Sequence, residues 1–112
     1  MKEFELQPLR IFAGWTVVYN QFSEYDLETD GDQYAYELVE DLLQLENRNL
    51  LIDLGWYPAM ELSGEYVLYM IDKTYERPFD EPLEVFQSRS KKEILQKLEY
   101  WMNCGHYQQY LR

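Results

Sequence analysis

The feature that most constrains the fold is an almost unbroken apolar run, Tyr66-Val67-Leu68-Tyr69-Met70-Ile71. A short apolar run bounded by turn residues is typical of a strand that is buried on both faces of a sheet. The run is far shorter than the roughly 20 residues that a membrane-spanning helix needs. We therefore expect residues 65–71 to form the central strand of a sheet, and we expect no membrane span.

Five further segments have the alternation or the β-branched and aromatic composition of strands: 4–11, 15–22, 41–46, 50–57 and 83–87. The first contains Pro8, which cannot donate to a central ladder and so indicates an edge strand. Asn47-Arg48-Asn49 predicts a hairpin, because asparagine tolerates the left-handed backbone of a tight turn. In 50–57 the even positions are all apolar, which places Asp53 on the opposite face.

One amphipathic helix is predicted from about Lys91 to Cys104. Ser90 and Glu93 form a capping box, and Gly105 is placed to end the helix. Apolar residues recur at helical spacing at Ile94, Leu95, Leu98, Trp101 and Met102. The pattern predicts one α+β domain, residues 1–112, with a mostly antiparallel sheet of about five strands and this C-terminal helix on one face, in two layers.

The aromatic residues divide into two groups. Those in apolar patterns are expected in the core: Trp56, Tyr66, Tyr69, Phe86 and Trp101. Tyrosines in polar stretches are expected to be partly exposed, namely Tyr25, Tyr34, Tyr36 and Tyr75. Such tyrosines either anchor a protein partner or pack locally through the ring with the hydroxyl in water.

The charge is strongly negative and unevenly spread. The chain has 10 Lys and Arg against 21 Asp and Glu, a net charge of −11. Nine of the acids and no base lie between Glu24 and Glu46. Such a field repels nucleic acid and anionic membrane surfaces and speeds encounter with a basic partner. We therefore expect a basic protein partner, no nucleic acid and no membrane.

The candidate binding residues lie in this acidic segment. We expect 23–33 to be a loop, and 34–40 to be a helical turn or more loop. Carboxylates supply the charge and two tyrosines supply aromatic anchors. The set is Asp26, Glu28, Asp30, Asp32, Tyr34, Tyr36, Glu37, Glu40 and Asp41.

The same segment approximates the spacing of a calcium loop. Asp26, Glu28 and Asp30 stand at positions 1, 3 and 5, glycine at position 6 and Glu37 at position 12. The match is poor, because position 3 is Glu, position 8 is polar and the preceding segment is predicted as a strand. We therefore predict no metal and no cofactor.

The only cysteine and the only histidine, Cys104 and His106, carry little catalytic signal. One cysteine forms no intramolecular disulfide, and two ligands do not make a zinc site. No orienting partner is evident, so we expect a half-buried cysteine and a surface histidine. Phosphate-loop, nucleophile-elbow and zinc-protease motifs are absent from the sequence, which favours a protein that is not an enzyme. Pairs such as Glu37 with Glu40 or Asp41 are expected by chance among 21 acids.

Blocks at 9–22, 40–45, 51–58, 64–68 and 88–90 resemble an uncharacterised family of small acidic proteins from Bacillus-type bacteria. They include Ala13-Gly14-Trp15-Thr16-Val17 and Leu51-Ile52-Asp53-Leu54-Gly55-Trp56. Some members resemble immunity proteins of polymorphic toxin systems, which neutralise a toxin made by the same cell. The resemblance implies a cytoplasmic, non-enzymatic protein that binds a basic, nuclease-like toxin domain.

Other classes stay open at this point. A small acidic secretion or assembly chaperone would have similar size and charge, but it would hold an unfolded apolar segment and usually work as a dimer. A calcium-binding or hydrolytic domain is the third alternative. The first ten residues, MKEFELQPLR, alternate charged and apolar side chains and do not predict a signal peptide. We expect a monomer or a weak dimer.

Overall fold

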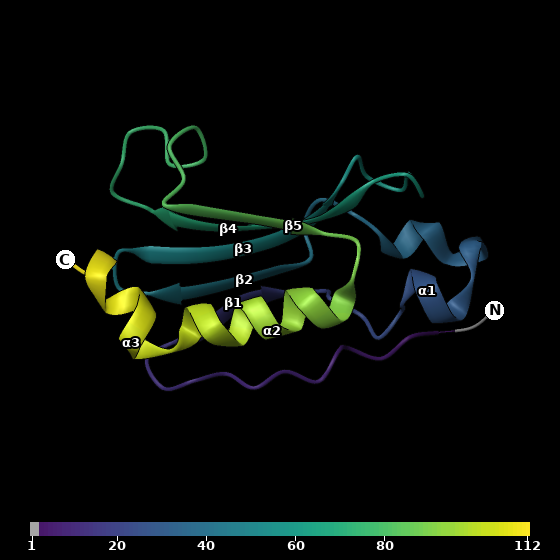
Figure 1. Ribbon diagram of the computed structural model, residues 1–112, viewed down its shortest axis with the longest axis horizontal. Coiled ribbons are helices and arrows are strands. Elements are labelled where there is room, and N and C mark those ends of the chain that lie inside the picture. The colour runs from purple at the N-terminus through teal and green to yellow at the C-terminus, as the bar shows by residue number, and fades with distance from the viewer. Residues whose placement is uncertain (1–2) are drawn as a thin grey trace.

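The computed structural model describes residues 3–112 and has two layers (Figure 1). One antiparallel sheet takes the strands in chain order: β1 Thr16–Asn20, β2 Leu43–Asn47, β3 Leu50–Tyr57, β4 Glu65–Asp72 and β5 Glu84–Ser88. The helix α2, Lys91–Met102, lies along one face, and α3, Cys104–Tyr107, and the 3-10 turn η2, Gln108–Tyr110, follow it. The predicted α+β architecture is confirmed. Within residues 3–112 no helix has the length and apolar character to cross a membrane.

The core lies between α2 and alternate residues of the inner strands. Ile52, Leu54 and Trp56 of β3 and Leu68 of β4 are buried there. From the helix side come Ile94, Leu98, Trp101 and Met102. The strand order corrects one prediction, because β3, not β4, is the middle strand. The longer apolar run of β4 reflects a position between β3 and β5, where both faces are largely covered.

The start of α2 agrees with the sequence and its end does not. Ser90 Oγ accepts a hydrogen bond from the backbone N–H of Glu93 at 3.2 Å, which confirms the cap. The Glu93 carboxylate contacts the Ser88 hydroxyl instead of completing the capping box. Asn103 ends α2, and its side chain accepts from the N–H of Gly105, so this glycine lies inside α3 and does not terminate the helix.

Residues 3–14 form an extended strap beside α2, which corrects the predicted edge strand at 4–11 (Figure 1). The strap makes one isolated β-bridge, Leu6 with Ser23, and it forms no strand. Leu9 and Phe12 pack against the core. An apolar alternation fits an edge strand and a strap equally well. Here the segment packs along the side of α2.

The β2–β3 hairpin forms as predicted, but with a different turn residue. Arg48 has a positive φ of 55°, and neither asparagine has one. Asn49 is buried and ties the turn to distant chain, donating to Asp72 Oδ2 at 3.0 Å and to the Tyr110 carbonyl at 3.1 Å. Its side chain is used for these contacts and not for the turn conformation.

Helix packing gives the first prediction. Ser90→Ala should lower the free energy of unfolding by about 1 kcal/mol through loss of the cap, and Trp101→Ala by about 3 to 5 kcal/mol through a cavity under the helix. Gln96→Ala, at an exposed position of the same helix, is the control and should change little. Urea unfolding measures all three, and a loss below about 1 kcal/mol for Trp101→Ala would contradict the packing described.

Candidate functional site

The acidic segment folds into a compact unit at one end of the sheet, which we call the acidic cap, residues 24–37 (Figure 1). It consists of α1, Leu27–Asp30, and the 3-10 turn η1, Asp32–Glu37, and so corrects the predicted loop at 23–33. Asp26 caps α1 by accepting from the N–H of Glu28 at 3.0 Å. Gly31 takes a positive φ of 84° between the two turns, a conformation that favours glycine.

An aromatic cluster holds the cap together from below. The Tyr25 ring is 1% exposed, contrary to its predicted partial exposure, and lies edge-on to Phe4 and Tyr34. Its hydroxyl donates to the Gly31 carbonyl at 2.7 Å. Tyr34 is half-buried in this cluster, whereas Tyr36 at its edge is 47% exposed. Of the two predicted anchors, Tyr36 is the more exposed to solvent.

A buried lysine joins the cap to the helix and the strap. Lys91, the first residue of α2, is 6% exposed, and its ammonium donates to the Ser23 carbonyl at 2.7 Å and to Gln7 Oε1 at 3.2 Å. The ammonium also lies 5.0 Å from the centre of the Phe22 ring. Burial lowers the pKa of Lys91 to about 8, although the carboxylates of the cap, Asp26 foremost, favour its charged form.

This pKa gives the second prediction. Lys91 releases its proton near pH 8 in the folded protein and near 10.5 when unfolded. Between these values the unfolded chain binds more protons, so the free energy of unfolding should rise with pH. Lys91→Met should remove that rise, whereas Lys92→Met, at the exposed neighbouring position, should keep it.

Urea unfolding at three pH values from about 7 to about 8.5 tests this, because the range lies well below the ordinary tyrosine pKa of about 10. The readout is the slope with pH, because either substitution also changes the stability itself. An equal slope in the two variants would contradict the assignment to Lys91.

The carboxylates of the calcium-like spacing serve the fold of the cap. Asp26 caps α1, and Asp30 Oδ2 accepts from the backbone N–H of Asp26 at 2.9 Å. Among residues 3–112, no three His, Cys, Asp or Glu side chains are arranged to hold a metal ion.

The third prediction concerns calcium. Calorimetry at physiological salt should detect no stoichiometric binding tighter than about 10 μM, because the ion would have to displace these hydrogen bonds. Glu37→Gln is the matched variant. Tighter binding that disappears in Glu37→Gln would contradict the prediction.

Two predicted site residues lie apart from the cap. Glu40 and Asp41 belong to the segment that runs beside β3 into β2, where the Glu40 carbonyl lies over Gly55 on the face opposite α2, which we call the open face. A Cβ at position 55 would lie 2.0 Å from the Glu40 carbonyl oxygen, so this close approach requires glycine. The nine predicted residues therefore divide between the cap and the open face.

The open face carries a row of side chains that runs across all five strands. The register pairs neighbours in the order Tyr19, Gln44, Asp53, Tyr69 and Val85. Residues paired in this way point to the same face. Tyr69 therefore lies on the open face, half-buried against Phe79, which corrects its assignment to the core.

Asp53 is the functional candidate that the sequence analysis did not select. Its carboxylate is 4% exposed and accepts from Gln44 Nε2 at 2.7 Å. The pKa of Asp53 is raised, chiefly by burial and further by the charge of Asp41, while the Gln44 hydrogen bond acts in the opposite direction. The signal in the sequence was the alternation of 50–57, which placed an acid opposite the apolar positions.

The C-terminal histidine is oriented, contrary to expectation. His106 Nε2 lies 2.5 Å from Glu84 Oε2, and the Tyr110 hydroxyl donates to the same oxygen at 2.8 Å. Cys104 is exposed, so the expected half-buried cysteine and surface histidine are exchanged. These contacts attach the C-terminal turns to β5.

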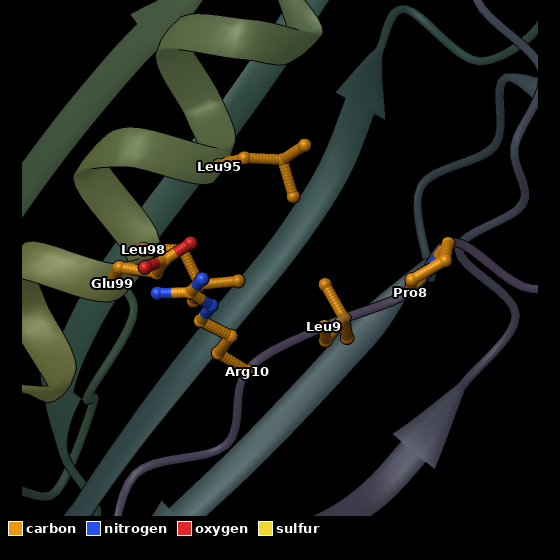
Figure 2. Close-up of a pocket in the computed structure, with 6 residues that line it drawn as sticks. All are labelled: Pro8, Leu9, Arg10, Leu95, Leu98 and Glu99. Carbon is orange, nitrogen blue, oxygen red and sulfur yellow. The ribbon is translucent and has the colours of Figure 1, made fainter.

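A hollow of about 240 Å³ lies between the strap and α2 (Figure 2). Leu9, Leu95 and Leu98 give it an aliphatic lining, and the charged ends of Arg10 and Glu99 point toward one another at one side. No histidine, cysteine or hydroxyl group lines it, so it offers no nucleophile.

Comparison with protein-family models, curated proteins and solved structures finds no match to this chain.

Proposed function

We propose that this protein is a non-enzymatic, acidic binding protein that neutralises a basic, nuclease-like toxin domain in the cytoplasm. The observation that carries the proposal is the acidic cap, where carboxylates surround an exposed aromatic ring without an exposed base among residues 24–37. The contact residues are those predicted from the sequence, with Glu40 and Asp41 extending the surface onto the sheet.

The charge of the cap suits a long-range role in binding. Glu28 and Asp32 are exposed, and Asp26, Asp30 and Glu37 are partly exposed. Because their fields add in the solvent beyond the cap, they attract a basic surface before contact. A nuclease cleft that binds phosphates is such a surface, and a row of carboxylates competes for it as nucleic acid does.

Tyr36 suits the short-range role. Charged rims contribute little to affinity unless they surround a side chain that becomes fully desolvated on binding. Tyr36 has 47% of its surface available for burial, and Tyr34 supports its ring from the side. The resemblance to immunity proteins points in the same direction, because these proteins act by binding alone.

The fourth prediction separates the two roles. The triple variant Asp30→Asn/Asp32→Asn/Glu37→Gln should slow association about tenfold at low salt and flatten its salt dependence. Tyr36→Ala should weaken the binding free energy by about 1 to 3 kcal/mol, mainly by speeding dissociation. Glu76→Gln/Asp80→Asn/Glu81→Gln, which removes the same charge from the exposed β4–β5 loop, is the control.

The measurement is binding kinetics at two salt concentrations with the basic protein that co-purifies from the native organism. Equal slowing by the control variant would mean that net charge alone acts. Affinity that is insensitive to salt and to both triple variants would place the binding surface elsewhere. Light scattering would detect the stable dimer expected of a chaperone.

A further inference from the structure

A hollow on the open face of the sheet adjoins the buried carboxylate of Asp53. The hollow measures about 230 Å³ and is lined by Tyr19, Asp41 and Gln44. Gln44 links it to Asp53, because its Nε2 donates to Asp53 Oδ2 at 2.7 Å. The hollow therefore has one carboxylate at its edge and a second one directly behind its amide wall.

Asp53 has no cationic partner within the described chain. The ion pairs of residues 3–112 include Lys73 with Glu46 at 3.0 Å on this face, but none that involves Asp53. A carboxylate that is 4% exposed and has one neutral donor is costly to keep ionised. Its pKa is raised by burial and by the charge of Asp41. A cation placed in the hollow would offset both effects.

The groups around the hollow match a planar cation with several donors. The Gln44 amide donates through Nε2 to Asp53, which leaves its Oε1 as an acceptor for a ligand. Asp41 supplies an exposed carboxylate, and the Tyr19 ring supplies an aromatic wall. A guanidinium group can donate to both acceptors at once and stack on the ring, whereas an ammonium group is a point charge.

We infer that this hollow receives an arginine side chain of the basic partner, with Asp41 and Gln44 as its acceptors and Asp53 as the charge behind them. The inference rests on the proposed function for the source of the arginine. Residues 38–41 join the cap to the hollow along the chain, and they run beside β3, where the Val39 carbonyl accepts from the Trp56 N–H and the Glu40 carbonyl lies over Gly55.

A metal ion is a poorer occupant of the same space. Asp41 and Asp53 are two carboxylates, and among residues 3–112 no group of three or more metal-binding side chains is arranged around a common point. Hard divalent cations take six or more oxygen ligands. One amide oxygen and one directly exposed carboxylate suit hydrogen-bond donors better.

The test uses a small probe, so that it does not depend on finding the partner. The ¹⁵N-labelled protein is titrated with Nα-acetyl-arginine methylamide and followed by NMR. Saturable shifts are expected at the Gln44 side-chain amide and at residues 19, 41 and 53, with millimolar affinity. The citrulline analogue, which has the same shape without charge, should produce none, and the lysine analogue should bind more weakly.

Variants identify the residues that carry the binding. Asp41→Asn should weaken arginine binding about tenfold, because it removes the direct charge, and Asp53→Asn about threefold, because it removes the charge behind Gln44. Asp80→Asn on the exposed β4–β5 loop is the matched control. A purely structural Asp53 would lose stability on substitution, whereas here the free energy of unfolding of Asp53→Asn at pH 7 should not fall.

Several results would overturn the inference. These are citrulline binding as strong as arginine binding, shifts at the cap instead of the hollow, the absence of saturable shifts, or unchanged affinity in both Asp41→Asn and Asp53→Asn. A partner that depends on the cap residues but not on Asp41 or Asp53 would keep the proposed function and reject this pocket. If arginine binds to the hollow but the cap variants do not affect partner binding, the pocket is kept and the proposed role of the cap is rejected.

Discussion

The rest of the structure depends on a single helix packing against one face of a five-stranded sheet. Trp101 and Leu98 of α2 meet Trp56 and Leu54 of β3 in one buried layer. Because there is no second long helix among residues 3–112, the strap and the cap cover the sides of this layer. The other face of the sheet carries no long helix and is covered only in part, and this is where the row centred on the buried Asp53 is found.

Two buried charges differ in what they do for the fold. Lys91 gains a backbone carbonyl, an amide oxygen and an aromatic face, and it holds the helix, the strap and the cap at one point. Asp53 accepts one side-chain hydrogen bond, from the Gln44 amide, and joins no other element of the fold. Its pKa is raised on folding, so its stabilising effect is lost as pH rises above the unfolded value of 3.8. A side chain that costs stability at neutral pH is more readily explained by binding than by packing.

The elements that could be predicted from the sequence are those fixed by local chemistry. The Ser90 cap, the alternation of 50–57 and the apolar run of β4 each specify their own conformation. The predictions that failed concern segments whose conformation depends on contacts with residues distant in the sequence. The strap has the pattern of an edge strand, but it lies along α2 and makes only one isolated bridge. Tyr25 lies in a polar stretch, but its ring packs edge-on against Phe4 and is buried. For the candidate site, the sequence located the acids and Tyr36 but not the separation of Asp41 from the cap.

That separation gives the acidic surface two different physical tasks. The cap carboxylates are largely solvated, so their field reaches outward and is screened by salt, which makes them suited to accelerating encounter. The hollow beside Asp53 is partly desolvated, so its charge acts at short range and in one geometry. Residues 38–41 connect the two regions through the backbone contacts of Val39 and Glu40 with β3. In the proposed function, a partner steered by the cap would reach a place where the position of one cation, and not only its charge, decides how long the complex lasts.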